Sequence, residues 1–207
     1  KILPIVPGDT KLSLETDISG SLGGKLRAKG GLKYSRVVMG QKSALGSVDS
    51  ADEGEIDYSL ELDKDSIEIQ NFKIRSGQSN FSGNGKLIGY KTKDPDLSFG
   101  VQADEFSIKE TRRKIPLILI PKTVHEHFYE LFSSGTLGIK SLQFDGSFEQ
   151  LKNLDSEENK DRITAEIYFK GMDWRSPLPL FKAVTGSFDY KNGDGFIEIM
   201  KARYEGF

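Results

Sequence analysis

The sequence predicts a mainly β protein: a strongly curved antiparallel sheet, or β-groove, of about ten strands with one short amphipathic α-helix. Apolar and polar residues alternate through most of the 207-residue chain, which is typical of strands with one buried face and one wet face. Turn sequences separate the alternating runs, and the strongest of them is Asn192-Gly193. The 22 glycines include several inside the runs, where glycine favours the bends of a curved sheet.

The alternation defines the expected strands. Leu12, Leu14 and Ile18 alternate with polar residues, as do the apolar residues of segments 56–62 and 163–169. One apolar face per strand favours antiparallel pairing over a parallel sheet buried on both sides. The expected strands cover residues 11–19, 22–29, 31–39, 55–62, 66–75, 80–90, 96–108, 136–149, 162–172, 183–191 and 196–204.

One segment departs from this pattern and predicts a helix over residues 123–132. Thr123 is a suitable N-cap with Glu126 in capping-box register, and Gly135 is a natural stop. Segments 40–54, 91–96 and 152–161 are polar and are expected to be loops. The apolar face of the expected helix consists of Val124, Phe128, Leu131 and Phe132, at positions i, i+4, i+7 and i+8.

A short pattern recurs in segments 18–22, 144–148 and 184–188: an apolar residue, any residue, Gly, Ser and a second apolar residue. It suggests duplicated hairpin units. Within a strand the glycine shares a face with its two apolar neighbours, so it leaves a notch between two bulky side chains. A bulge or a close backbone approach explains such a notch. A curved sheet with a notched apolar face would also accommodate flexible apolar molecules such as acyl chains.

Composition excludes several functions. The net charge of −2 offers no basic footprint for nucleic acid, and a chain without cysteine has no disulfide, thiolate metal site or Cys nucleophile. His125 and His127 stand two residues apart, whereas a helical metal site needs spacing of four. No nucleophile elbow or phosphate-binding loop is present. We therefore expect no catalytic residues, no metal, no cofactor and no enzymatic activity.

Three stretches resemble the AsmA-like family: residues 12–22 leading to 28–32, residues 95–108 followed by a proline and a short amphipathic helix, and residues 135–207. The resemblance implies a periplasmic β-rich body with the repeating β-groove architecture of lipid transfer proteins. The chain starts at Lys1 and stops inside an expected strand, so we expect one domain, residues 1–207, that is a fragment of a larger AsmA-like protein. The family implies a parent protein anchored in the inner membrane of the cell envelope.

The function that the resemblance implies is the shielding of phospholipid acyl chains during lipid transport between membranes, in outer-membrane biogenesis and homeostasis. Inner-membrane or outer-membrane proteins are possible partners, and the oligomeric state stays open. A basic cluster of residues 109–114 could meet lipid headgroups or could be a solvated loop. The residues expected to line the groove are Phe81, Leu97, Phe99, Val101, Ile163, Ile167, Phe169, Val184 and Phe188.

Two alternatives remain at this point. The same nine residues could form a dry core, in which case the chain is a structural or scaffolding module for envelope assembly without a ligand. A carbohydrate-binding sandwich is a third possibility, which an exposed aromatic platform with nearby polar groups would favour. An open apolar channel distinguishes the lipid-handling function from the other two.

Overall fold

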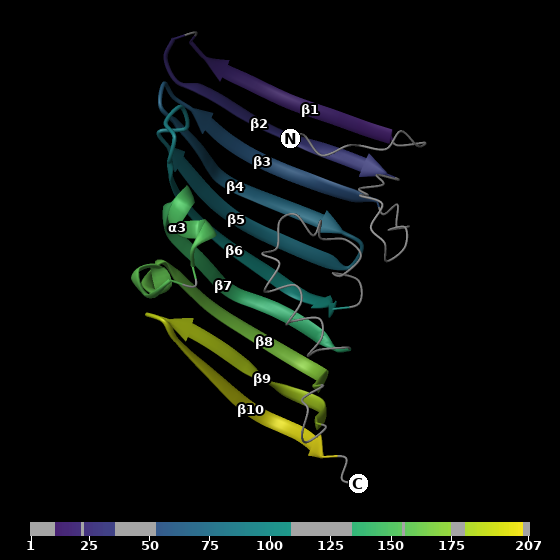
Figure 1. Cartoon of the computed structure of the whole chain (residues 1–207). Helices are drawn as coiled ribbons and strands as arrows, with labels where there is room; N and C mark the ends of the chain where they lie inside the picture. Colours follow the sequence, from purple (N-terminus) through teal and green to yellow (C-terminus); the bar gives the residue numbers. More distant parts are fainter. Residues whose placement is uncertain are drawn as a thin grey trace, which may run out of the picture.

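The computed structural model describes residues 11–21, 23–35, 53–108, 134–154, 156–174 and 181–204. These residues form a single ten-stranded sheet in which every strand pairs antiparallel with its neighbours in the sequence (Figure 1). The prediction of a mainly β antiparallel fold is confirmed. The strands are β1 (Lys11–Gly20), β2 (Leu26–Ser35), β3 (Gly54–Leu62), β4 (Ser66–Ser76), β5 (Ser79–Ile88), β6 (Asp96–Ser107), β7 (Thr136–Ser147), β8 (Ile163–Trp174), β9 (Phe181–Lys191) and β10 (Asp194–Tyr204).

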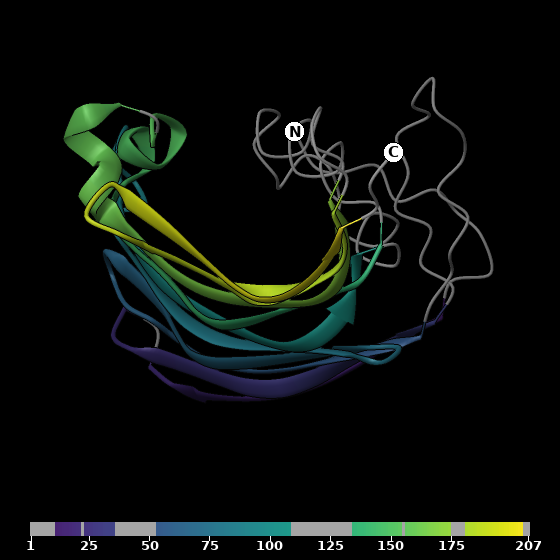
Figure 2. The ribbon, with the colours of Figure 1, turned by 90° about the horizontal axis from the view of Figure 1, so that it is seen from below.

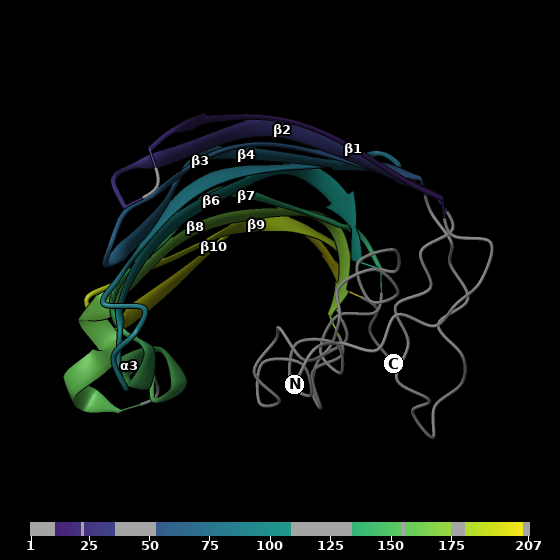
Figure 3. The same cartoon turned by 90° about the horizontal axis from the view of Figure 1, so that it is seen from above.

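The sheet is arched, so it has a concave and a convex face (Figures 2 and 3). The strands curve along their length (Figures 2 and 3). The hollow of the concave face therefore extends perpendicular to the strands, from β1 to β10. The sheet stays open, with β1 and β10 at its two edges. Because it is neither closed nor strongly curled, the expected strong curvature is not confirmed.

One expected strand break is wrong. Segments 22–29 and 31–39 were predicted as two strands, but Gly30 and Gly31 lie inside the continuous strand β2. Glycine is needed there for packing, since an ideal Cβ at Gly30 would lie 2.2 Å from the carbonyl oxygen of Glu15 in β1. The chain turns earlier, where the backbone N–H of Gly24 donates to the carbonyl of Ser21.

Two short helical segments follow β7, where the sequence predicts the end of a strand and then a charged loop. The first is α3 (Phe148–Lys152), and the second is the 3-10 helix η2 (Glu157–Arg162). A capping box explains α3: the Ser147 side chain accepts from the backbone N–H of Gln150, and the Gln150 side chain accepts from that of Ser147. The strand expected over residues 136–149 therefore ends at Ser147.

Several expectations fall outside the described residues. These are the helix over 123–132 with its apolar face, the His125 and His127 pair, the basic cluster in 109–114 and nearly all of the loop 40–54. They stay predictions.

The strand register separates the two faces of the sheet by chemistry. Directly paired residues of antiparallel strands lie on the same face, so a line of paired residues across the strands forms a rung. The central rung is apolar at every one of its ten positions. It consists of Leu14, Leu32, Ile56, Ile74, Phe81, Ala103, Ile139, Ile167, Phe188 and Ile197.

The apolar face is the concave one. Gly146 pairs with Leu97 on the apolar face, and an ideal Cβ at Gly146 would lie 2.7 Å from the side chain of Gln150 in α3. The helix α3 lies on the concave side of the sheet, at one rim (Figures 2 and 3). The charged residues that alternate with the apolar ones consequently lie on the convex face.

β-Bulges keep the apolar residues on the concave face where the alternation in the sequence is interrupted. The pairing shifts by one residue at Gln70 in β4, at Lys140 in β7 and across Lys170–Gly171 in β8. Each bulge inserts polar residues between two apolar runs of opposite phase, and it also bends its strand. Gly171 has a φ of +61°, a backbone conformation that suits glycine.

Most of the fully buried side chains lie toward the ends of β6, β7, β8 and β9 away from α3. Met172 and Val184, which pair across β8 and β9, are 1% and 0% exposed. The rest of this core cluster is Ala103, Phe106, Ile108, Leu137 and Phe169. The core that the described residues form is small, because the sheet has no second layer of strands or long helices among them.

Gly186 in β9 provides a test of the close packing between strands. An ideal Cβ there would lie 2.1 Å from the carbonyl oxygen of Glu198 and 2.9 Å from the ring of Phe169. We expect Gly186→Ala to lower the free energy of unfolding by about 1–3 kcal/mol because the backbone must shift to admit the methyl group. Gly100→Ala is the matched control, since only the Asn84 side chain, 3.4 Å away, approaches that Cβ. Equal losses in urea denaturation would contradict this packing.

Candidate functional site

The nine residues that the sequence predicts for an apolar groove all lie on the concave face. Their pairing shows this, because each faces another concave residue across β5, β6, β7, β8 and β9: Phe81 faces Ala103, Phe99 faces Phe144, and Ile167 faces Phe188. The face is thus assembled from at least four consecutive hairpins. We call it the concave apolar face.

The nine residues differ in burial, and the half-buried ones at the α3 end lie beside two buried side chains, Phe144 and Ala165, which are 2% and 8% exposed. Phe169 and Val184 belong to the buried core cluster. Phe81, Ile167 and Phe188 are partly exposed and pack against that cluster. Leu97, Phe99, Val101 and Ile163 are half-buried and lie toward the α3 end of their strands.

Of the three glycines in the recurring pattern, Gly186 is covered by a cross-strand ring, whereas the Gln150 side chain covers Gly146 and the carbonyl oxygen of Lys25 lies against Gly20; rings also cover other glycines of this face. The ring of Phe72 lies 2.7 Å from an ideal Cβ at Gly83, its cross-strand partner, and the ring of Phe169 lies 2.9 Å from one at Gly186. Tyr34 covers Gly54 in the same way. The glycines therefore let cross-strand rings lie flat, so the concave apolar face is smoother than the sequence pattern suggests.

Aromatic contacts link neighbouring strands on the concave face. The ring centroids of Phe99 and Phe144 are 5.6 Å apart with an interplanar angle of 28°. Those of Phe81 and Phe106 are 5.3 Å apart and tilted by 38°. Such pairs stabilise a sheet by about 0.5–1.5 kcal/mol each beyond the burial of their area, which helps a single-layer sheet to hold its shape.

The convex face carries the charges, and ion pairs connect its strands. Glu61 accepts hydrogen bonds from Lys25 at 2.5 Å and Arg27 at 2.9 Å. Arg75 donates to Glu55 at 2.7 Å and Asp57 at 3.1 Å. The hydrogen bond from Lys25, followed by that from Arg27, holds the pKa of Glu61 below its ordinary value of 4.5. The hydrogen bond from Arg75 lowers the pKa of Glu55 in the same way.

These lowered pKa values predict a small loss of stability in acid. A carboxylate with a lower pKa in the folded state stabilises the fold above its unfolded pKa, and this contribution disappears as the pH falls through the folded value. We therefore expect the melting temperature of the wild-type protein to decrease when the pH is lowered below about 4.5. The Glu61→Gln variant should have a lower melting temperature than wild type at about pH 7, and its melting temperature should decrease less in acid. Glu158→Gln, in η2, is the control and should behave like wild type.

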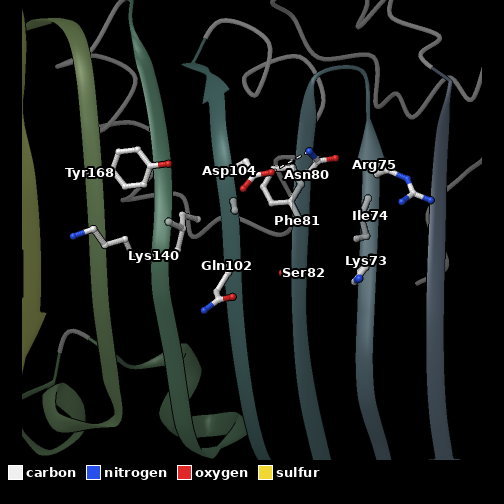
Figure 4. A pocket seen from close by; sticks show the side chains of 12 residues that line it. Lys73, Ile74, Arg75, Asn80, Phe81, Ser82, Gln102, Asp104, Lys140 and Tyr168 are labelled. Carbon is white, nitrogen blue, oxygen red and sulfur yellow. Dashed lines mark hydrogen bonds between the residues drawn. The ribbon is translucent and has the colours of Figure 1, made fainter.

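A shallow pocket of about 630 Å³ lies across β4 to β8 (Figure 4). Its labelled lining is mainly polar: Asn80 donates to Asp104 at 3.0 Å, and Lys73, Gln102 and Tyr168 contribute further polar groups. Phe81 is the only one of the nine sequence-predicted groove residues that lines it. This pocket is therefore distinct from the half-buried apolar residues near α3.

Among the described residues, no group of three or more His, Asp or Glu side chains is arranged to hold a metal ion. No helix in that same part of the chain is both long enough and apolar enough to cross a membrane.

Sequence reasoning missed several members of the concave apolar face. Tyr58 and Phe72 face each other on β3 and β4, and Leu142 faces Val101 on β7 and β6. The signal was present in the sequence, because each lies in an alternating run. Phe72 and Leu142 follow a bulge, however, and a strict period of two assigns them to the wrong face.

Comparisons with known proteins gave no match: no family model, no curated protein and no solved structure is significantly similar to this chain.

Proposed function

We propose that the chain is a non-enzymatic lipid-handling segment that shields phospholipid acyl chains on its concave apolar face. The observation that supports this most is the central rung, which is apolar from Leu14 in β1 to Ile197 in β10. Among the described residues no second layer of strands or long helices lies over this rung, and proteins rarely leave a continuous apolar surface of this extent without a binding role. Each CH₂ group removed from water on such a surface contributes about 0.8 kcal/mol.

The dimensions of the sheet also suit acyl chains. Neighbouring strands lie about 4.8 Å apart, so the concave face extends roughly 43 Å across the strands from β1 to β10. The hydrocarbon of one membrane leaflet is about 15 Å thick, half of the bilayer core. The face is thus long enough for more than one acyl chain. Because its contacts are apolar throughout the central rung, it selects for hydrocarbon and not for one headgroup.

The resemblance to the AsmA-like family supports a location for this activity. On that basis we infer a periplasmic position, in a larger protein attached to the inner membrane, and a role in lipid transport to the outer membrane. Inner-membrane or outer-membrane proteins would be its partners.

A scaffolding function is the second candidate, and the buried cluster around Val184 and Met172 favours it. That end of β8 and β9 is a filled core, as expected of a structural module without a ligand. The two candidates differ over the α3 end, where Leu97, Phe99, Val101 and Ile163 are half-buried.

Native mass spectrometry of the purified chain tests the proposal. We expect phospholipid masses to co-purify, with a fluorescent fatty acid displacing them. A chain that carries no lipid and binds no probe would favour the scaffolding function.

A further inference from the structure

The pocket across β4 to β8 lies on the convex face, opposite to the concave apolar face. Its polar lining residues alternate along the strands with Ile74, Phe81, Ala103 and Ile139. These four belong to the central rung, so their side chains point to the concave side. The backbone of the central rung therefore forms the floor of the pocket, and convex side chains stand on both sides of this floor (Figure 4).

Two lines of polar side chains border the floor. Lys73, Ser82 and Gln102 pair across β4, β5 and β6 and form the first line. Their side chains make no hydrogen bond or ion pair with the described residues. The second line contains Asn80 and Asp104, joined by a hydrogen bond of 3.0 Å in which the Asn80 amide donates. This bond holds the carboxylate in place and leaves further donors and acceptors of the pair for a ligand.

Tyr168 contributes an aromatic ring to the pocket at β8. Its cross-strand partner is Gly138, and an ideal Cβ at Gly138 would lie 2.1 Å from the ring. Glycine thus allows the ring to lie over the β7 backbone, with its hydroxyl directed toward Asp104 (Figure 4). The amine of Lys170 lies 5.8 Å from the ring centroid, and the ring still lines the pocket. The pocket therefore combines an aromatic platform with amide, hydroxyl and carboxylate groups.

This combination suits an acidic saccharide. The C–H face of a sugar ring stacks on an aromatic side chain, and its hydroxyls need partners that donate and accept hydrogen bonds, as amides and carboxylates do. The lining also carries three cations, Lys73, Arg75 and Lys140, against the single carboxylate of Asp104. Arg75 is already bound to two carboxylates of β3. Lys73 and Lys140 have no ion-pair partner among the described residues, so the pocket has positive charge to offer at β4 and at β7.

We propose that this pocket binds a short acidic oligosaccharide that lies across β4 to β8, with one sugar ring on Tyr168 and carboxylates near Lys73 and Lys140. Four strand spacings separate β4 from β8, roughly 19 Å, which requires a ligand of several sugars. An acidic peptide is less suited, because peptides bind a sheet through a free edge or apolar anchors. The pocket lies in the middle of the sheet and its side chains are polar. This site is independent of lipid binding on the concave apolar face.

Calorimetric titration of the 207-residue chain with tetragalacturonate, a linear saccharide with one carboxylate on each sugar, tests the proposal. We expect a dissociation constant in roughly the submillimolar range. Maltotetraose has the same number of sugars and no charge, so it should bind at least about tenfold more weakly. No binding of tetragalacturonate at about 5 mM, or equal binding of maltotetraose, would overturn the proposal. Equally tight binding of tetraglutamate would also overturn it, because charge alone would then explain the affinity.

Variants of the lining locate the site. Tyr168→Ala should weaken the binding of tetragalacturonate at least about tenfold, whereas Tyr168→Phe keeps the ring and should bind within about threefold of wild type. If Tyr168→Ala fails to fold, Gln102→Ala, at an exposed position, should weaken binding in its place. Lys73→Ala should weaken binding at least about threefold. Lys29→Ala removes an exposed convex lysine of β2, outside the pocket, and should have no effect. Equal effects of the two lysine variants would overturn the proposal.

Discussion

Phe99→Glu is expected to leave the protein folded and to abolish its retention of phospholipid. Phe99 is half-buried on β6, toward the α3 end and outside the core cluster. A charge in a sealed core would unfold the sheet, but at a surface open to water it keeps most of its hydration. The same charge repels hydrocarbon, so a lipid that lies over β6 loses its contact. Native mass spectrometry and binding of a fluorescent fatty acid measure the effect.

Two further variants make this result interpretable. Ile163→Glu places the charge on β8, in the same rung as Phe99 and Phe144, and should behave alike. Gln102→Glu adds the same charge to β6 on the exposed, polar side and should bind lipid as wild type does. If Phe99→Glu and Ile163→Glu are insoluble, the face is a dry core, and that result would favour the scaffolding function over lipid handling. If both fold and bind the probe normally, the ligand site lies elsewhere or is absent.

Met172→Ala is expected to lower the free energy of unfolding by about 2–5 kcal/mol. Met172 is 1% exposed and faces Val184 across β8 and β9, so its loss leaves a cavity in the small core. A loss of this size is a large fraction of the stability of a typical domain. Urea denaturation followed by circular dichroism measures it.

The control has the same substitution in a different place. Met200→Ala removes the same atoms from a side chain that is 65% exposed on β10, so we expect a change within about 0.5 kcal/mol. Similar losses for the two variants would mean that the cluster around Met172 does not carry the stability of the sheet.

The alternation of apolar and polar residues was sufficient to predict an antiparallel sheet and the face on which all nine groove residues lie. It was sufficient because each expected strand from 55–62 onward overlaps a single observed strand. Glycine was the main source of error at the N-terminal end. Gly30 and Gly31 were interpreted as a break, whereas they allow β1 and β3 to approach β2 closely.

Two other features required information that alternation does not contain. The capping box of Ser147 and Gln150 starts a helix where apolar Phe148 still fits the alternation of β7. The burial of each groove residue depends on what packs over it, so Val184 and Leu97 have similar local sequence signals but different burial. Local pattern therefore predicts the face of a side chain but not its depth.

The bulges determine which positions of the sequence lie on the concave face in each strand. In β8 the apolar residues before and after Lys170–Gly171 have opposite parity in the sequence, and the extra residue restores them to one face. Removing one residue there would turn every later side chain of the strand inside out, exposing Met172 and burying Asp173. Length changes are consequently excluded from the strands, although single substitutions at exposed positions are not. The turns at the rims, such as Asn192-Gly193, are where insertions can accumulate without changing which positions lie on the concave face.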